Sequence, residues 1–336
     1  MSRRSPFLYR ALALLAVLMV ISTLVGAAEL GSAGGATPNA TGGTLHLMLE
    51  SRLPRSFAAL LAGSAMAVAG VIMQQLVRNR FVEPSTTGTT EGAMLGLIVI
   101  TLLAPGAPVM VKMVVAAGTA LMAAALFLAL VRRLSPRDPF MVPLVGMIWS
   151  GILGAGASWF AWQADLVQYL GNWMTGDFSG VIAGRYELLW IAGAVALLAY
   201  FAADMLTIAG MGEGTALSLG LNYRGALRLG LVAVSLVTAL VVVTVGAIPF
   251  IGLVVPNIVA RLMGDRLRAS LPVVAVGGAI LVLSADIIGR LIRYPYEIPV
   301  GTVAGVLGAA IFLWLLSSKP RRHRAPHRQK EAHHAS

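Results

Sequence analysis

The stretch LGLVAVSLVTALVVVTVGAIPFIGLVVPNIVA, residues 229–260, contains no charged side chain. As a single α-helix it would extend about 48 Å at about 1.5 Å per residue, whereas the hydrocarbon core of a bilayer is about 30 Å thick. Gly246 and Pro249 lie in the middle of the run, and proline interrupts a helix. The stretch therefore predicts two membrane-spanning helices with a break between them.

Comparable charge-free runs occur along most of the remaining chain. They cover 11–28, 56–77, 92–111, 113–131, 139–164, 188–203, 269–285 and 298–318, and with the divided run they predict ten spans. The composition agrees, because 58% of the 336 residues are hydrophobic and 12% are charged, against roughly 25% charged in an average soluble domain. A water-soluble globule is excluded, and we expect an all-α, polytopic membrane protein.

Positive charge is unequally distributed between the two sides of these ten spans. Of the 25 Lys and Arg residues, 19 fall on the side of the N-terminus and six on the other side. The positive-inside rule then predicts that both termini are cytoplasmic. A cleaved signal peptide is the alternative interpretation of the first span, but its apolar run of 18 residues is longer than usual for one. We therefore favour a retained span.

The predicted organisation is one membrane permease domain, 1–318, followed by a basic cytoplasmic tail, 319–336. Within the domain, the Gly/Ala/Thr-rich stretch 29–50 is expected to be an external linker and 207–225 a cytoplasmic loop. The tail holds six Lys and Arg residues. On a membrane domain such a tail indicates contact with anionic lipid rather than with nucleic acid.

Several kinds of chemistry lack the residues that they need. The lysines are Lys112, Lys319 and Lys330, and none follows a glycine-rich loop, so we expect no Walker-type nucleotide site. The absence of cysteine excludes thiolate metal sites, and His46 stands apart from the histidines of the tail. Acidic residues fall outside the charge-free runs, which disfavours an ion-coupled secondary transporter. We expect a non-enzymatic subunit without metal or cofactor, driven by a partner.

Arginines gather on the outer side, where positive charge is otherwise scarce. Arg52, Pro54 and Arg55 stand at the outer mouth of the second span, and Arg290 and Arg293 are predicted on the same side. The functional interpretation is that Arg52, Arg55 and Arg290 dock an acidic partner. The alternative is that they anchor the helix ends at the membrane interface.

Small residues mark two spans that should pack closely against their neighbours. The second span contains Gly63 and Gly70 and is followed by Gln74, and the last span contains Gly301 and Gly305. Small residues let helix backbones approach, so we favour packing over pore lining and expect the second span to be an interior helix.

The loop TIAGMGEGTALSLGLNYRG, 207–225, is too polar to cross the membrane, yet its leucines are regularly spaced. We expect a short helix and a turn that offer a docking surface to a cytoplasmic protein, with a plain connector as the alternative. The residues proposed for this contact are Gly210, Gly212, Leu217, Leu219, Gly220 and Leu221.

Taken together, these motifs resemble the FecCD-type permeases of ABC importers, the family of the iron-siderophore and vitamin B12 transporters. The matching strings are RLPR at 52–55, QQLVRNRFVEP at 74–84, the loop 210–221, the 27 residues 246–272, and ADIIGRLIRYPYEIPVG at 285–301. The strings RNRFVEPSTTGTTEGA, GDFSG and GRYELLW are similar to the branch that imports ferric catecholate and mixed-type siderophores. The resemblance covers roughly residues 44–316.

The resemblance implies ten helices, a second permease subunit, two cytoplasmic ATPase subunits and an extracytoplasmic siderophore-binding protein. It assigns 207–225 to the coupling helices, and it pairs Arg52, Arg55 and Arg290 with glutamates of the binding protein. The implied function is import of a ferric siderophore across the cytoplasmic membrane of a prokaryote by alternating access. Cobalamin or haem is the alternative cargo, and a self-contained secondary transporter is the alternative of a different class.

Two positions depart from the family pattern. Asn257 stands where a histidine is usual after VVP, and Gly308, Ala309 and Ala310 stand where the last span usually has GAP. Loss of the proline should straighten the last helix. No role can be assigned to Asn257 from the sequence.

Overall fold

The computed structural model describes residues 5–25, 48–131, 133, 141–184, 186–264 and 266–317, and these contain helices and no β-strand. The helices are α1 (Ser5–Leu24), the π-helix η1 (Met48–Arg52), α3 (Leu53–Val77), the 3₁₀ helix η2 (Ser85–Thr87), α4 (Thr89–Leu103), α5 (Val109–Val131), α6 (Met141–Gln163), α7 (Val167–Met174), α8 (Leu188–Phe201), α9 (Ala203–Gly210), α10 (Glu213–Ser218), α11 (Tyr223–Val245), α12 (Ile251–Met263), α13 (Leu267–Ile292) and α14 (Val300–Ser317). The expected tail and most of the expected linker, 29–47, lie outside the described residues.

Each of the ten predicted apolar runs coincides with a helix of this set. Seven helices are long and apolar enough to cross a membrane, and α8 with α9, joined by a bend of 68°, would make an eighth. The helices α4 and α12 are apolar but shorter, at 15 and 13 residues. The all-α, polytopic class is therefore confirmed, while the number of crossings stays a prediction.

The break predicted in the run 229–260 separates α11 from α12 at 246–250. Gly246 ends α11 with a φ of 84°, in the region that favours glycine. Phe250, which precedes α12, also has a positive φ, of 67°, which is uncommon for a bulky residue. Its N–H donates to Glu83 Oε1 at 3.1 Å, and its side chain lies against Gly308 of α14. These contacts hold the segment in its bent conformation.

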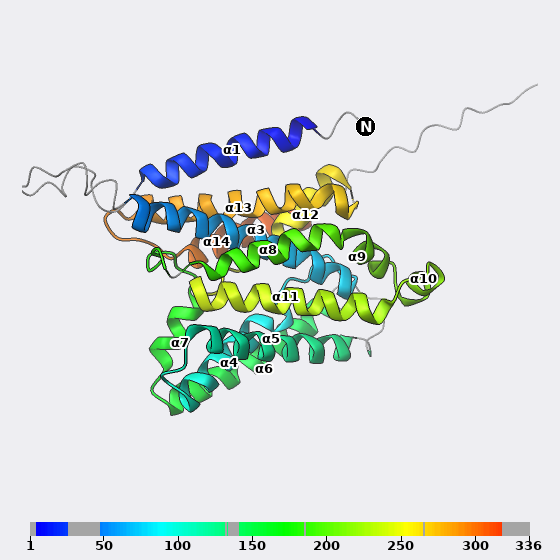
Figure 1. Cartoon of the computed structure of the whole chain (residues 1–336), viewed down its shortest axis with the longest axis horizontal. Coiled ribbons are helices and arrows are strands. Elements are labelled where there is room, and N and C mark those ends of the chain that lie inside the picture. The colour runs from blue at the N-terminus through cyan, green and yellow to red at the C-terminus, as the bar shows by residue number, and fades with distance from the viewer. Residues whose placement is uncertain are drawn as a thin grey trace, which may run out of the picture.

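The helices lie side by side with α3 in the interior (Figure 1). The helix α3 packs on α13, α11, α12 and α8, and 83% of its most apolar window is buried, the highest share among the candidate spans. At one edge, α1 packs mainly on α13, and at the opposite edge lie α4, α5 and α6. The prediction that the second span is an interior helix is therefore confirmed.

Glycines allow the closest approaches of α3 to its neighbours. Gly63 faces the backbone of Gly278 in α13, and Gly70 faces the backbone of Gly252 in α12. A β-carbon at either position would overlap the facing carbonyl group, so neither can gain a side chain without separating the helices. Gln74, one turn further, donates to the carbonyl of Gly252 at 3.2 Å. Gly63 and Gly70 thus serve helix packing, while Gln74 bonds α12 and also borders a cavity. The position of these residues relative to a transport pathway stays a prediction.

The last helix, α14, runs without interruption from Val300 to Ser317. Its expected straightening stays a prediction. Gly301 begins it in close contact with the segment before α8, because its N–H donates to the carbonyl of Gly176 at 2.8 Å. Gly305 makes an ordinary contact with Pro249. Both glycines therefore place α14 against the α11–α12 break.

Candidate functional site

At the end of the bundle that is predicted to face outward, called the outer end below, two arginines bind the last carbonyl groups of α1. Arg52 Nη1 donates to the carbonyl oxygens of Thr23 and Leu24, both at 3.2 Å. Arg290 donates to the Ser22 carbonyl at 2.9 Å and to the carbonyl of Val25. The last carbonyls of a helix have no partner within it, and their negative partial charge favours a cation. The two arginines thus cap α1 from η1 and α13.

Asp286 of α13 joins the arginines to one another. Its Oδ1 accepts from Arg55 Nη2 at 2.7 Å, and its Oδ2 accepts from Arg290 Nη2 at 2.6 Å. Arg55 also pairs with Glu297, at 2.8 Å between Nη1 and Oε2. Asp286 is fully buried, and such a charge is tolerated only when it is paired and hydrogen-bonded. Arg55, Arg290, Asp286 and Glu297 therefore form a compact cluster in which two positive charges are balanced by two negative ones.

A docking role requires exposed arginines, and the sequence-based interpretation was wrong to assume that these three are exposed. The exposed fraction is 6% for Arg52 and 5% for Arg290, and the side chain of Arg55 is 12% exposed. The physical reason is that Asp286, Glu297 and the end of α1 come together only in three dimensions. Arg293, by contrast, is exposed, and its guanidinium carbon lies 5.8 Å from the centre of the Tyr296 ring. The docking role of Arg52, Arg55 and Arg290 stays a prediction.

At the opposite end, which is predicted to face the cytoplasm, the loop 207–225 forms the short helix and the turn that its sequence predicted. The helix α10 projects from the bundle beside α9 (Figure 1). Its Ala216 is buried, whereas Leu217 and Leu219 are 59% and 61% exposed. Gly212 and Gly220 flank it with φ values of 107° and 76°, which only glycine adopts readily. The arrangement presents two apolar side chains on a narrow projection, while Leu221 turns partly inward.

This projection is fixed to the bundle at several points. Gly210 lies against the Gln75 side chain. Gly212 lies close to the Arg78 guanidinium at the end of α3, since a β-carbon added at Gly212 would be 2.9 Å from Arg78 Nη1. Asp204 of α9 pairs with Arg268 at the start of α13. Displacement of α9 and α10 would therefore be transmitted to α3 and α13.

Asn257, the departure from the family pattern, connects two elements. Its Nδ2 donates to the carbonyl of Arg80 at 2.8 Å and to that of Leu253, one turn back in α12, at 2.7 Å. The amide thus ties α12 to the segment that follows α3. A cavity of about 320 Å³ lies beside it, bordered also by Gln74 and Gly210.

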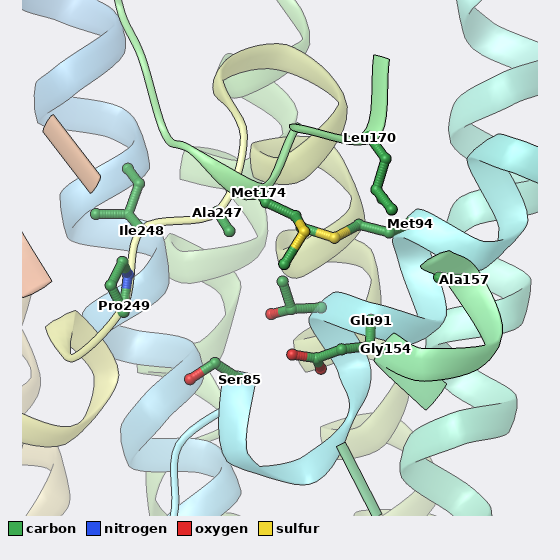
Figure 2. Close-up of a pocket in the computed structure, with 11 residues that line it drawn as sticks. Ser85, Glu91, Met94, Gly154, Ala157, Leu170, Met174, Ala247, Ile248 and Pro249 are labelled. Atoms are coloured by element: carbon green, nitrogen blue, oxygen red, sulfur yellow. The ribbon is translucent and has the colours of Figure 1, made fainter. Parts of the chain in front are cut away.

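A second cavity, of about 160 Å³, lies inside the bundle between α4, α6, α7 and the 246–250 break. Figure 2 shows the side chains of Met94 and Met174 next to each other on one side and Glu91 facing them from α4. Glu91 Oε2 is buried and has no hydrogen-bond partner among the described residues. Sequence analysis missed this residue, because it lies one position before a charge-free run and looks like a boundary.

Buried acids correct a premise of the sequence analysis. Glu83 and Asp286 are buried inside the bundle, and Glu91 has a buried oxygen. Asp286 is paired, whereas Glu83 accepts from Ser85 Oγ at 2.6 Å and from the Phe250 N–H. Neither Glu83 nor Glu91 has an ion-pair partner in the part of the chain that the structure describes. The absence of buried acids thus cannot be used against an ion-coupled carrier, and the class has to be decided otherwise.

A comparison with family models decides the class of transporter. The model of the FecCD transport family matches residues 12–318. The chain belongs to the FecCD transport family. The resemblance drawn from the motifs is thereby confirmed. With its apolar helices, this FecCD protein is a multi-pass protein of the bacterial cytoplasmic membrane.

Individual relatives of this FecCD protein are named as permeases for siderophores or for vitamin B12. It is 44% identical over 269 residues to the petrobactin import system permease protein YclN of Bacillus subtilis, covering 80% of this chain and 85% of the relative. Identity is 41% to the ferric-anguibactin transport system permease protein FatD of Vibrio anguillarum, covering 80% and 86%. It is 34% to the vitamin B12 import system permease protein BtuC of Vibrio cholerae, covering 81% and 82%.

The fold of this FecCD protein also matches a solved structure. A metal-chelate type ABC transporter in an inward-facing conformation aligns with a TM-score of 0.76 at 22% identity, covering 92% of this chain and 98% of that one. No group of three or more His, Asp or Glu residues suited to a metal ion occurs among the described residues.

Proposed function

We propose that the chain is the permease subunit of an ATP-driven importer that carries a ferric siderophore across the cytoplasmic membrane. The observation that carries the proposal is the family match over 12–318, together with relatives named for petrobactin and ferric-anguibactin at 44% and 41% identity. The vitamin B12 relative matches at 34%, so cobalamin is the second candidate cargo. The hydrolysis of ATP belongs to separate ATPase subunits, and a second permease completes the membrane part.

The proposed mechanism is mechanical. ATP binding closes the ATPase dimer, whose cleft holds the exposed Leu217 and Leu219 of the α9–α10 projection. The projection moves, and its contacts with Gln75, Arg78 and Arg268 carry the motion into α3 and α13. The two permease subunits then rock and open the pathway between them to one side at a time.

An acidic siderophore-binding protein is proposed to dock at the outer end. Because Asp286 and Glu297 already neutralise Arg55 and Arg290, the carboxylates of the binding protein must compete with them for the guanidinium groups. Exposed Arg293 adds positive charge beside this cluster. The basic tail, 319–336, is proposed on its composition to lie against the anionic headgroups of the inner leaflet.

The experiment is an uptake assay in bacteria that lack their own siderophore and cobalamin permeases. The cells express this chain with its ATPase and binding protein and are offered iron-labelled petrobactin, iron-labelled anguibactin or labelled cobalamin. Uptake of a ferric siderophore, abolished by a catalytically inactive ATPase, is the expected result. Uptake of cobalamin alone would transfer the function to the second candidate, and uptake independent of the ATPase would contradict the proposal.

A further inference from the structure

Glu91 presents an unpaired carboxylate oxygen to the cavity of Figure 2. It lies in the first turn of α4, where the helix dipole stabilises an acid by about 0.3–1 kcal/mol. A buried carboxylate that stays ionised without a counter-charge costs several kcal/mol, and neither the dipole nor the neutral Ser150 hydroxyl that bonds the Glu91 side chain supplies that counter-charge. Ionisable groups at such positions in membrane proteins usually serve function.

The surroundings of the cavity add negative charge and no positive charge. Glu83, a second buried carboxylate, is close enough to act electrostatically on Glu91. Its own oxygens accept hydrogen bonds from Ser85 and Phe250, which are neutral groups. No Lys, Arg or His occurs among the described residues that line the cavity. The site therefore favours a guest that brings a positive charge and donates a hydrogen bond.

The size and the remaining wall of the cavity restrict that guest further. A volume of about 160 Å³ resembles the roughly 150 Å³ cavity that accepts benzene, so one small group fits and a whole iron chelate does not. Opposite Glu91 the wall is formed by Met94, Met174, Leu170 and Ala157. Methionine side chains adapt to irregular apolar groups. An alkyl arm that ends in an ammonium group satisfies both the acid and the apolar wall.

The cavity lies behind α6, and two properties of α6 favour a position beside the transport pathway. Among the candidate spans, α1 and α6 are the least buried in this chain. On α6, a β-carbon at Gly151 or Gly156 would meet no atom within 4 Å, which leaves room for another helix to approach closely, whereas α1 contains no glycine. The α6 face therefore suits the second permease, and the cavity is one helix away from the interface.

We propose that the Glu91 cavity binds a protonated amine on an alkyl arm of the transported chelate during its passage. The inference rests on the proposed function and names the class of siderophore: iron chelates that carry an alkyl arm ending in a free amine. Glu91 accepts the charge-assisted hydrogen bond, and the methionines contact the methylene groups.

The test uses two iron chelates with the same catecholate groups, one with an alkyl side arm that ends in a free amine and one with that amine N-acetylated. The complete transporter is reconstituted in proteoliposomes, and the binding protein is preloaded with one chelate so that its own selectivity does not enter. One charge-assisted hydrogen bond corresponds to about tenfold, so the wild type should transport the amine chelate about tenfold faster.

Glu91→Gln keeps the shape of the side chain and removes its charge, and it should abolish this preference. Glu91→Asp should retain part of it. The matched control is Glu187→Gln, an exposed carboxylate that accepts from the Gly184 N–H at 2.7 Å, and it should leave the preference intact. Should Glu91→Gln fail to assemble, Ala157→Val reduces the cavity with the acid in place and should lower the preference as well.

The outcomes separate the two proposals. Transport of neither chelate by the wild type contradicts the proposed function for this cargo class. Equal transport of both by the wild type, or a tenfold preference that survives in Glu91→Gln, overturns the inference and leaves the proposed function standing. An unchanged preference in Ala157→Val, where Glu91→Gln does not assemble, overturns it too.

Discussion

At the scale of single residues, Asp286 determines how the outer end of the bundle accommodates its arginines. The carboxylate bonds both Arg55 and Arg290, and Arg290 in turn bonds the end of α1. A carboxylate that serves two guanidinium groups restrains both, and Arg differs from Lys in being able to make such forked contacts. The position of three helices thus depends on one acid.

Asp286→Asn should therefore destabilise the protein markedly. Breaking a buried ion pair by removing one partner costs about 3–5 kcal/mol, because the other charge stays buried. We expect a clearly lower unfolding temperature of the purified protein in detergent. Asp204→Asn is the matched control, since its pair with Arg268 is exposed and should contribute little. Equal unfolding temperatures for wild type and Asp286→Asn would show that the cluster does not stabilise the outer end.

Glu297→Gln should strengthen the binding of an acidic binding protein. The substitution releases Arg55 Nη1 from its pair at 2.8 Å and leaves Asp286 in place. If Arg55 docks the partner, affinity should rise at low salt, and the gain should shrink as salt screens the charges. Binding to the permease in nanodiscs, measured at two ionic strengths, gives the answer. An unchanged affinity would indicate that Arg55 serves the cluster alone. Charge reversal of Arg52 or Arg290 is a poorer test, because both are buried against α1 carbonyls.

At the scale of elements, the α9–α10 projection links an exposed apolar tip to the buried centre of the bundle. Leu219→Asp should abolish ATP-driven uptake and co-purification with the ATPase, because a carboxylate cannot enter an apolar cleft without loss of its hydration. Amounts in the membrane should not change. Leu262→Asp, at an equally exposed leucine near the end of α12, is the control and should retain coupling. Normal uptake by Leu219→Asp would contradict the coupling role.

Gly212→Asp should also uncouple transport, for a different reason. Gly212 has a φ of 107°, and a side chain there would contact the Arg78 guanidinium. The substitution therefore strains the backbone of the projection as well as changing its charge. Gly212→Ala, which adds strain without charge, should lower uptake in part, and uptake is the measurement for both. Wild-type rates in both variants would show that this backbone conformation is not needed.

The elements themselves were largely predictable, whereas the site contacts were not. Hydropathy located each long helix, and Gly246 with Pro249 located the break, because both signals are local in sequence. The burial of Arg290 depends on Ser22, 268 positions away, and no local pattern reports that distance. The cavity position of Glu91 could likewise not be predicted from the sequence, because the packing of α6 and α7 on α4 creates the cavity. The glycines of α3 were predictable in kind, but their partners Gly278 and Gly252 were not.

At the scale of the whole molecule, the chain supplies a pathway and depends on partners for energy. None of its three lysines follows a glycine-rich loop. The purified protein should therefore neither bind nor hydrolyse ATP, and hydrolysis should begin when the ATPase subunits are added. Phosphate release, with an ATPase-free preparation of the same membranes as background, measures this. Turnover by the isolated chain would overturn its assignment as a subunit.

The capping of α1 by Arg290 has a consequence for synthesis in the cell. The helix that leaves the ribosome first is completed by a side chain made 268 positions after Ser22. At a synthesis rate of roughly 5–20 residues per second, Arg290 is made on the order of 15–50 seconds after Ser22. Throughout this interval α1 can be capped by Arg52 but lacks its contacts with Arg290. A premature stop at or shortly before codon 290 would release a product without Arg290, in which Arg52 is the remaining arginine of the pair that caps the first helix.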